Sequence, residues 1–493
     1  MDSLAALLWG KSTGVIFLGI ALLVLVVLLW LPADIGEVRV GTDKIGVISG
    51  AALSQETLSY TLSLPLIMRG YPPPPPVFGV YMGPVNESGG VTQAIQAGVH
   101  WVNLSAFNWA AIEPQLTDPP TYHWEVVDEQ SFIDAAQNDL TVIARVSATP
   151  QWAREIPGHN CSRIRRDSLD EFARFLAELV RRYQALPYNI RYWELDGEVD
   201  VAPSLVDPAN PIGFWCWGDD EDAYYGGGYF AEMLRWAYPA IKAADPQAQV
   251  VIGGLLLDCD PRNPPPGKTC TPARFLEGIL RGGGGPYFDV VSFHSYAYYG
   301  GTPGDMGNPN WTGGVWMQST VVREKASFLR EVLNTYGYEN KGLMNTETAL
   351  FCFEASDECF QTQAMYVPRA YAEALAYDLM AQVWFLMKDP VWRNTGLLRA
   401  DMTPKPVYYA YATAATFLSS VEYVGPVAGY PAEVEGYAFH RTNGARIEVI
   451  WSEDGGSHAV GLPSGASAYD KYGSLLPGPS ILVDNSPVYI SWP

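Results

Sequence analysis

The chain has 493 residues, of which 48% are hydrophobic and 17% charged, with a formal net charge of −22. This length suits one large barrel of roughly 250 residues or more, together with additional segments. Because nucleic acid is bound by a basic face, the acidic balance argues against a nucleic-acid-binding protein.

The first predicted element is an apolar segment near the N-terminus. Residues 12–33 carry no charge and include "GVIFLGIALLVLVVLLWL", which is long enough to span a bilayer. Trp9 and Trp30 lie where interface aromatic residues are expected. The alternative is a cleaved signal peptide ending at Ala33, but Leu31 is large for its position before such a site. We therefore expect an uncleaved transmembrane helix within residues 1–33 and a single-pass membrane protein.

Residues 34–76 follow as a predicted juxtamembrane segment that ends in the stiff polyproline spacer "YPPPPP". The six cysteines all lie beyond it. Cys259 and Cys270 bracket a Pro-rich loop and Cys352 and Cys359 bracket a short one, which suggests these two of the 15 possible pairings and leaves Cys161 with Cys216. Three disulfides would place the folded body outside the cytoplasm, whereas the alternative is six buried free thiols. The sequence has no CxxC motif and no His at zinc spacing, so a metal site is not expected.

Short apolar runs then alternate with amphipathic helical stretches. The predicted strands cover residues 77–82, 100–105, 140–147, 190–195, 249–254, 288–294, 342–347 and 382–387. Helical periodicity between them is clearest at 168–184 and 319–337. Eight such β-then-α units predict an α/β fold, a closed parallel (β/α)8 TIM barrel over residues 77–420.

The pattern changes after about residue 421. "EGYAFHRTNGARIEVIWSEDGG" has the period-two alternation and the turn residues of antiparallel strands. Residues 421–493 are therefore predicted to form a small all-β, sandwich-like module that packs on the barrel.

Two glutamates lie at the C-terminal ends of predicted barrel strands, where barrels place their chemistry. Glu198 follows the fourth strand in "RYWELDGEVD", and Glu347 ends the seventh in "MNTETA". Glycoside hydrolysis uses such a pair, one carboxyl group to protonate the leaving oxygen and the other to attack or to activate water. The alternative is that either is an ordinary loop carboxylate, since the chain has 53 acidic residues.

Several segments resemble motifs of the large clan of (β/α)8 retaining glycoside hydrolases, which includes β-xylosidases, endoglucanases and β-galactosidases. "YWELDGEVD" resembles the strand-four motif W-E-x-x-N-E-P, and "NTETA" resembles the strand-seven segment of the nucleophile. "FNWAAIEPQ" with "YHWEVVD", "ATPQWA", and "SFHSY" resemble the ends of strands two, three and six. Each motif is weak alone, but their order and spacing across residues 77–420 are specific.

The resemblance implies that Glu198 is the acid/base and Glu347 the nucleophile of an enzyme acting on oligo- or polysaccharide, without a cofactor or metal. The remaining predicted substrate-binding positions are His294, Tyr296, Trp384, Asn103, Trp109 and Trp152. Tyr296 would donate a hydrogen bond to the nucleophile and His294 would line the same pocket. Trp384 would form the floor under the sugar ring. For His294 and Trp384 the alternative is ordinary packing inside the barrel.

The sequence departs from the clan beside both carboxylates. Gly197 stands where the clan has an asparagine that binds the sugar 2-hydroxyl, and Asn103 stands where it usually has an arginine near the nucleophile. A second interpretation follows, in which an impaired barrel is a carbohydrate-binding or structural subunit of a membrane assembly. One further pair is predicted, between Glu194 as a buried structural acid and Arg145 on the neighbouring strand.

Overall fold

The computed structural model describes residues 76–208 and 214–493. The predicted transmembrane helix in residues 1–33 and nearly all of the segment 34–76 lie outside the described residues. Within the part that is described, no helix has both the length and the hydropathy needed to cross a bilayer.

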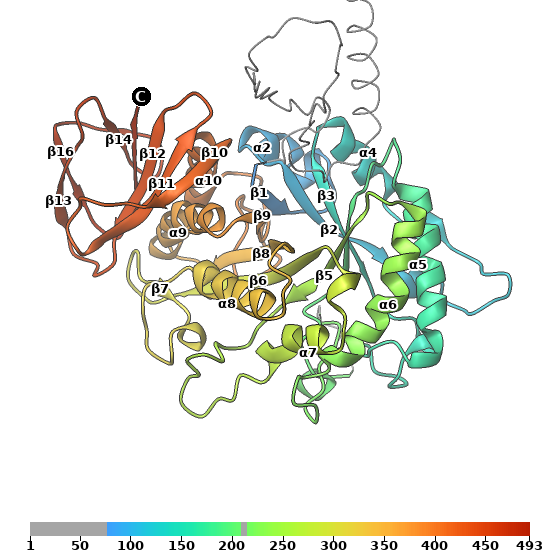
Figure 1. The fold of residues 1–493 in the computed structure, drawn as a ribbon. Helices are drawn as coiled ribbons and strands as arrows, with labels where there is room; N and C mark the ends of the chain where they lie inside the picture. The colour runs from blue at the N-terminus through green and yellow to red at the C-terminus, as the bar shows by residue number, and fades with distance from the viewer. Residues whose placement is uncertain (1–75, 209–213) are drawn as a thin grey trace, which may run out of the picture. The chain divides into compact units, whose positions relative to one another are not determined.

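Parallel strands close into a barrel at the centre of the molecule (Figure 1). The barrel strands, in spatial order, are β1 Phe78–Tyr81, β2 Trp101–Asn108, β3 Thr141–Ser147, β4 Tyr192–Gly197, β5 Gln249–Leu255, β6 Val290–Tyr299, β8 Gly342–Phe351 and β9 Leu379–Trp384. The barrel closes because β9 pairs with β1, and β5 pairs with β6. The two-residue strand β7 Met306–Gly307 is added antiparallel to β6. The predicted parallel TIM barrel is thus confirmed.

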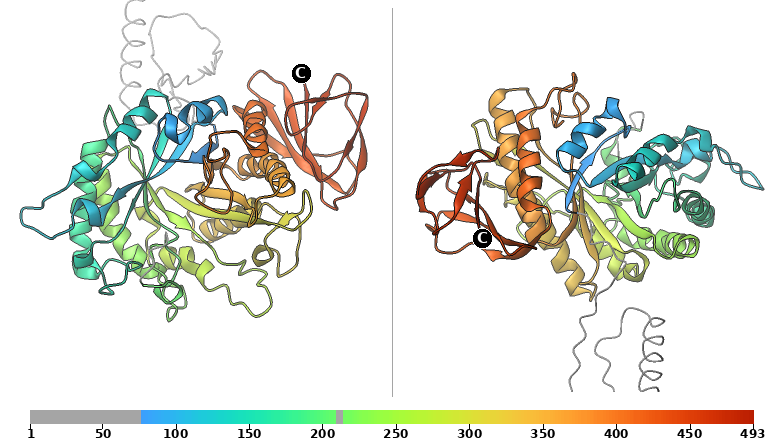
Figure 2. Two further views of the ribbon diagram at one scale, coloured as in Figure 1. Left: turned by 180° about the vertical axis from the view of Figure 1, so that it is seen from behind. Right: turned by 90° about the horizontal axis from the view of Figure 1, so that it is seen from above.

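Helices surround the strands, as Figures 1 and 2 show. They are α2 Val91–Gln96, α3 Trp109–Ile112, α4 Glu129–Gln137, α5 Leu169–Tyr183, α6 Gly227–Ala244, α7 Phe275–Arg281, α8 Val322–Thr335, α9 Asp357–Ala376 and α10 Pro406–Leu418. Helix α5 illustrates the sequence logic, because its apolar residues recur at helical spacing and are buried. The strands inside are buried on both faces, so they read as nearly continuous apolar runs, as in "QVVIGGL" of β5.

The C-terminal residues form two antiparallel sheets. The larger contains β10 Val421–Pro426, β11 Val434–Arg441, β12 Arg446–Ser452, β17 Val488–Trp492, β14 Ser467–Tyr469 and β15 Leu475–Leu476, and the smaller pairs β13 His458–Gly461 with β16 Ser480–Val483. Ile450 and Ile490 of the larger sheet share one apolar core with Val483 of the smaller. This arrangement confirms the predicted all-β domain after the barrel.

The other face of the larger sheet packs on the barrel, beside α9 and α10 (Figure 2). Phe417 of α10 stacks on Tyr489 with ring centroids 4.5 Å apart. A polar contact adds to this, because the Arg369 guanidinium of α9 donates to the Asn485 carbonyl at 2.6 Å. The β module therefore buries one face of its sheet against the barrel, where it covers helices and not the ends of the barrel strands that carry the glutamates.

All three predicted cysteine pairs are disulfides, Cys161–Cys216, Cys259–Cys270 and Cys352–Cys359. Each fixes a loop at the C-terminal ends of the barrel strands. These disulfides restrain the loops around the barrel mouth, since each crosslink restricts the conformations of the loop it closes.

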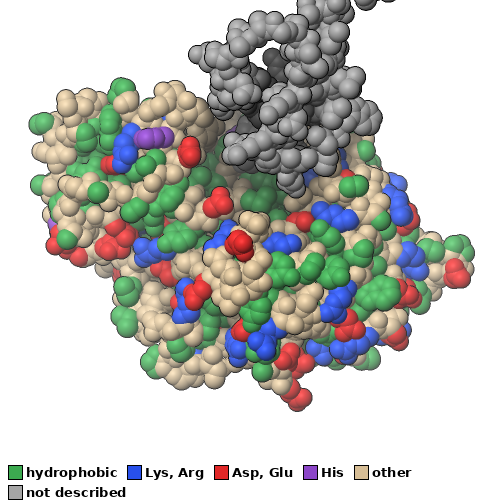
Figure 3. Space-filling model, in the orientation of Figure 1, with side chains coloured by type: hydrophobic (Ala, Val, Ile, Leu, Met, Phe, Trp, Pro, Cys, Tyr) green, Lys and Arg blue, Asp and Glu red, His purple; other side chains and the backbone are tan. Residues whose placement is uncertain are grey.

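On the face drawn in Figure 3, acidic and basic side chains of the described residues are interspersed.

Candidate active site

Glu198 lies directly after β4, in an unusual backbone conformation. Asp196 and Glu198 both have positive φ, 64° and 51°, which is uncommon for residues other than glycine. The Glu198 amide donates to the Gly254 carbonyl at the end of β5, at 2.7 Å. Such strained residues persist where their surroundings hold them, and they cluster at functional sites. The turn directs the Glu198 carboxylate into the barrel mouth.

Glu347 lies on β8 opposite His294 on β6. A register shift between Phe293 and His294 brings His294 level with Glu347 in the parallel pair. The Tyr296 hydroxyl, two residues further along β6, donates to Glu347 Oε2 at 2.6 Å. The predicted contact between Tyr296 and Glu347 is therefore present, and Glu347 is 7% exposed.

His294 joins the two carboxylates. Its Nδ1 lies 2.9 Å from Glu198 Oε1 and 3.4 Å from Glu347 Oε2. Burial opposes the charge on the imidazole, but the negative charge of Glu347 and the hydrogen bond to Glu198 raise the pKa of His294 overall. Nε2 has no hydrogen-bond partner among the described residues. His294 is among the residues that line the cavity, whereas its Nε2 is buried beside Gly254.

The space beside the imidazole depends on Gly254. A Cβ built at Gly254 would lie 2.1 Å from His294 Nε2, closer than atoms can approach. We expect Gly254→Ala to displace the ring and to lower kcat/KM roughly 100-fold or more, since a misplacement of about 1 Å can have that effect. Kinetics and the melting temperature, measured together, check this. Full activity at unchanged stability would mean that His294 has no part in catalysis.

Arg145, on β3, binds the nucleophile candidate from the other side. Its Nη2 donates to Glu347 Oε1 at 3.0 Å, and its Nε donates to Glu194 Oε2 at 2.9 Å. Glu194 is fully buried, so the predicted Arg145–Glu194 pair is confirmed. Burial alone would raise the pKa of Glu347, but the charges of His294 and Arg145 and the hydrogen bonds from Tyr296 and Arg145 lower it below its usual value. Glu347 is thus held as a carboxylate.

The inference from Asn103 that no arginine lies near the nucleophile is wrong, because Arg145 takes that place. Asn103, on β2, is fully buried and donates to the Thr346 carbonyl at 3.2 Å, below the carboxylates. The guanidinium that binds Glu347 comes instead from the neighbouring strand. It occupies the space beside Gly197, where a Cβ would lie 3.1 Å from three guanidinium atoms. Gly197 is therefore the residue that leaves room for Arg145.

The carboxylates line a cavity of about 490 Å³ at the barrel mouth. Its aromatic walls are formed by Tyr81, Phe214, Trp215, Tyr296, Tyr298, Trp311, Phe351, Phe385 and Trp392. Polar groups converge between these walls, namely Arg145, Glu198, His294, Lys325 and Glu347. A concave, largely aromatic pocket with a few convergent polar groups is typical of a small-molecule site.

Four predicted substrate contacts do not line this cavity. Trp384 is fully buried, and its Nε1 donates to the Thr395 carbonyl at 2.7 Å. Strand β9 ends at Trp384, earlier than the predicted strand at 382–387, and Phe385 faces the cavity instead. Trp109 is buried against α5, and Trp152 donates to the Glu113 carbonyl at 2.9 Å. Of the four, Asn103 alone contacts the groups beneath the carboxylates, through Glu194 and Thr346.

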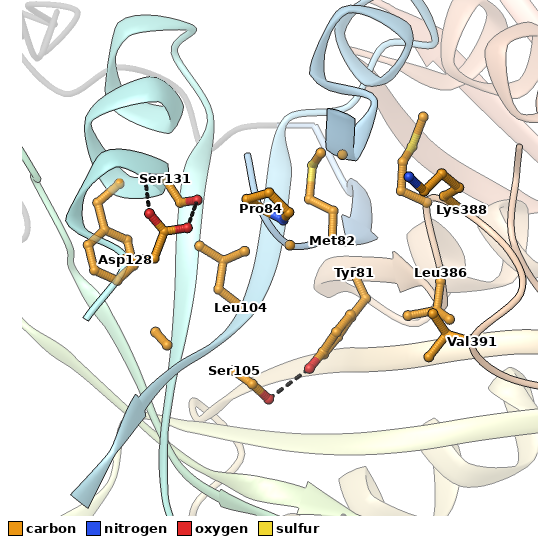
Figure 4. A pocket seen from close by; sticks show the side chains of 15 residues that line it. Tyr81, Met82, Pro84, Leu104, Ser105, Asp128, Ser131, Leu386, Lys388 and Val391 are labelled. Carbon is orange, nitrogen blue, oxygen red and sulfur yellow. Dashed lines mark hydrogen bonds between the residues drawn. The ribbon is translucent and has the colours of Figure 1, made fainter. Parts of the chain in front are cut away.

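A second cavity of about 560 Å³ adjoins the first (Figure 4). Tyr81 and Ser105 line both, and their hydroxyl groups are hydrogen-bonded at 2.7 Å. Its other walls are mostly apolar, and Asp128 at the far side already accepts from the Ser131 hydroxyl at 2.6 Å. Neither Glu198 nor Glu347 lines it, so we assign the chemistry to the cavity that holds the carboxylates.

Two clusters have the composition of a metal site. One atom each of Glu198, His294 and Glu347 lie within 4.8 Å of one another. The guanidinium of Arg145 already neutralises Glu347, and His294 Nδ1 sits between the carboxylates as a hydrogen-bond donor, so the residues fit a hydrogen-bonded pair better than a cation. The second cluster, around Asp258, includes two cysteines that form a disulfide and offer no thiolate.

No protein-family model matches the sequence, and no curated protein matches it significantly. Solved structures do match. A family 39 glycoside hydrolase from the gut symbiont Bacteroides cellulosilyticus WH2 aligns with a TM-score of 0.63 at 18% identity, over 85% of this chain and 81% of that one. The chain has the fold of the (β/α)8 glycoside hydrolases.

Two further glycoside hydrolases support the same fold. The catalytic domain of family 30 xylanase C from Talaromyces cellulolyticus aligns with a TM-score of 0.56 at 14% identity, over 84% of this chain and 96% of that one. A family 39 β-xylosidase from Caulobacter crescentus aligns with a TM-score of 0.54 at 13% identity, over 85% and 97%. At such identities the likeness concerns the fold, and activity has to be argued from the site.

Proposed function

We propose that this protein hydrolyses O-glycosidic bonds by a retaining double displacement, with Glu347 as nucleophile and Glu198 as acid/base. The observation that carries the proposal is the approach of the two carboxylates, whose oxygens lie within 4.8 Å of each other on either side of His294. Retaining enzymes place the two carboxyl groups about 5–5.5 Å apart, whereas inverting enzymes separate them by about 6.5–9.5 Å to admit a water molecule.

In the first step, Glu347 attacks the anomeric carbon while Glu198 gives its proton to the leaving oxygen. The glycosidic bond breaks and an ester bond forms between Glu347 and the sugar. Arg145 and Tyr296 supply the electrostatic conditions, because they hydrogen-bond both oxygens of Glu347 and favour its ionised form.

In the second step, Glu198 acts as a base and removes a proton from water, which attacks the anomeric carbon and releases Glu347. His294 is within hydrogen-bond distance of both carboxylates in turn. His294 holds the two carboxylates in position for reaction at the anomeric carbon. Because it lines the cavity, it would lie close to the sugar ring.

The second interpretation, a barrel that has lost catalysis, was based on two residues of the clan that this sequence lacks at Gly197 and Asn103. Arg145 supplies one of them from β3, and its charge, with that of His294, lowers the pKa of Glu347, as a nucleophile that must stay ionised requires. These contacts around Glu347 favour an enzyme. Carbohydrate, in oligomeric or polymeric form, is the substrate class that we propose.

We further propose that the barrel works outside the cytoplasm, attached to a membrane by the apolar segment 12–33. Three disulfides in the described residues support an oxidising compartment. Fractionation of membranes with N-terminal sequencing of the mature protein tests the anchor separately from the activity.

The activity is tested with the purified full chain on a panel of aryl β- and α-glycosides. Proton NMR of the first product anomer distinguishes the mechanisms, because a double displacement retains the anomeric configuration. We expect a product of the same configuration as the substrate. An inverted product would reject Glu347 as nucleophile, and no hydrolysis of any glycoside, combined with sugar binding, would favour the binding-protein interpretation.

A further inference from the structure

The two sides of the catalytic cavity differ in chemistry. Around Glu347 the wall is aromatic, and Phe351 stacks on Tyr296 with centroids 4.6 Å apart. Beyond Glu198 the wall comes from the loops after β4, β5 and β6 and from α8, and it is mixed. Its aromatic rings are Phe214, Trp215 and Trp311, and its polar side chains include Asp258, Lys268, Asn310 and Lys325. If Glu198 protonates the leaving oxygen, the leaving group lies against this mixed wall, where polar groups can bind it.

Lys325 is the unusual member of the wall. It lies in the first turn of α8, is 4% exposed and reaches between two strands of the barrel. Its Nζ donates to the Leu256 carbonyl at 2.6 Å and to the His294 carbonyl at 2.7 Å. An ammonium group has three N–H donors, so one is not used by these two carbonyls. Nζ also lies 5.3 Å from the centroid of the Trp311 ring, which lines the same cavity as Lys325.

The charge on Lys325 is maintained despite its burial. Burial lowers the pKa of Lys325 to about 8, and the nearby carboxylates of Asp200, Glu198 and Asp258 oppose this effect. The side chain is therefore still an ammonium at neutral pH. A buried charge costs several kcal/mol of desolvation in general, whereas a neutral side chain would suffice for tying two loops together.

The wall around Lys325 is also fixed in place. Asp200 accepts hydrogen bonds from the Leu256 and Leu257 amides, both at 2.7 Å. The Trp311 indole donates to the Leu257 carbonyl at 3.0 Å. These bonds fix the backbone of residues 256 and 257, one of whose carbonyls accepts from the Lys325 ammonium.

We propose that Lys325 binds the leaving group, donating its third N–H to an oxygen of a sugar or polyol, and so sets the preference for hydroxylated leaving groups. This inference rests on the proposed function, because only the role of Glu198 identifies its side of the cavity as the leaving-group side. The natural substrate is then a glycoside linked to a second sugar or polyol, not one with an apolar aglycone.

The test compares Lys325→Met with the wild type on two substrates that share one glycone, a 4-nitrophenyl glycoside and the corresponding disaccharide. Methionine keeps the apolar stem and removes all three donors. Hydrogen bonds to charged groups are strong, so we expect kcat/KM for the disaccharide to fall roughly 10- to 100-fold further than for the aryl glycoside. Lys341→Met is the matched control, because Lys341 donates to the Phe288 carbonyl at the opposite end of the barrel.

If Lys325 has a purely structural role, Lys325→Met should lower kcat/KM for both substrates by the same factor. That result would overturn the inference. Binding provides a readout that does not need turnover. In a Glu347→Gln background, calorimetric titration with the disaccharide should show a weaker Kd when Lys325 is also replaced, and an unchanged Kd would equally reject the contact. If the wild type cleaves the aryl glycoside but neither cleaves nor binds any disaccharide, the inference is overturned and the proposed function stands. If it cleaves neither kind of substrate, the proposed function itself fails, and the inference fails with it.

Discussion

Glu347→Gln is expected to lower kcat/KM by roughly 10⁴-fold or more on every glycoside that the wild type hydrolyses, as loss of a nucleophile does in other enzymes. Glutamine has nearly the same shape but cannot form the ester intermediate. Tyr296 still has an oxygen to donate to at its 2.6 Å position, so binding of substrate should change far less than turnover. Steady-state kinetics with calorimetric binding separates the two effects.

The exposed Glu339 offers a matched control, since Glu339→Gln makes the same chemical change away from the cavity. Glu347→Ala adds an independent measurement. The smaller side chain leaves room for azide, which should restore turnover and give a glycosyl azide of inverted configuration. Residual activity above a few per cent in Glu347→Gln, or no response of Glu347→Ala to azide, would contradict the assignment of the nucleophile.

Arg145→Gln is expected to have the second large effect, and to change the pH dependence of activity. The folded-state pKa of Glu347 lies below its usual value, partly because of the Arg145 charge. The stability that ionised Glu347 contributes is therefore fully present above the pKa of this group in the unfolded chain. It is lost as the pH falls through the pKa of Glu347 in the folded protein. Without the guanidinium, the acid limb of kcat/KM should move upward by roughly one pH unit or more. A pH–rate profile measures this directly.

The same substitution should destabilise the barrel. Glu194 is fully buried and loses the ion pair with Arg145 Nε. Breaking one partner of a buried pair typically costs about 3–5 kcal/mol. Arg145→Lys retains the charge without the forked donors, and it should restore part of the acid limb. An unmoved acid limb in Arg145→Gln would mean that the arginine serves structure alone.

The close approach of Arg145 to Gly197 also predicts the effect of Gly197→Asn. This prediction is opposite to the one made from the sequence. From the sequence alone, restoring the asparagine of the clan is expected to raise turnover if the protein is a weakened enzyme. The structure predicts the opposite, because the new Cβ would lie 3.1 Å from three guanidinium atoms of Arg145 and the amide would need the same space. Gly461→Ala, at a strand position with open space, is the control. Increased turnover in Gly197→Asn would show that Arg145 can move aside.

Much of the fold could be predicted from the sequence because the signals are local. The apolar runs and the helical periodicity placed every barrel strand within a few residues, and the change of period placed the β module. Glu198 and Glu347 were singled out because one follows the predicted fourth strand and the other ends the predicted seventh, and the ends of parallel strands meet at one mouth of a barrel. Proximity along the chain gave the pairs Cys259–Cys270 and Cys352–Cys359, which are 11 and 7 residues apart, and Cys161 and Cys216 were the two that remained.

The sequence left out what depends on register and on side chains from distant segments. The pair of Arg145 with Glu194 was predicted, but Arg145 also contacts Glu347, which lies 202 residues away along the chain. No local pattern indicates that an arginine on β3 replaces one on β2, or that Gly197 makes room for it. Phe385 and Lys325 reach the cavity from the end of β9 and from a helix outside the barrel, where composition carries no signal.

The division has one physical cause. Strand periodicity and the position of a residue at a strand end are set by neighbouring residues, so the sequence by itself determined the barrel, the β module and the two glutamates. Which side chains meet those glutamates is set by strand pairing, such as the register shift that aligns His294 with Glu347. Only the tertiary structure decided that Arg145 binds Glu347, that Trp384 is buried, and that Lys325 lines the cavity beyond Glu198.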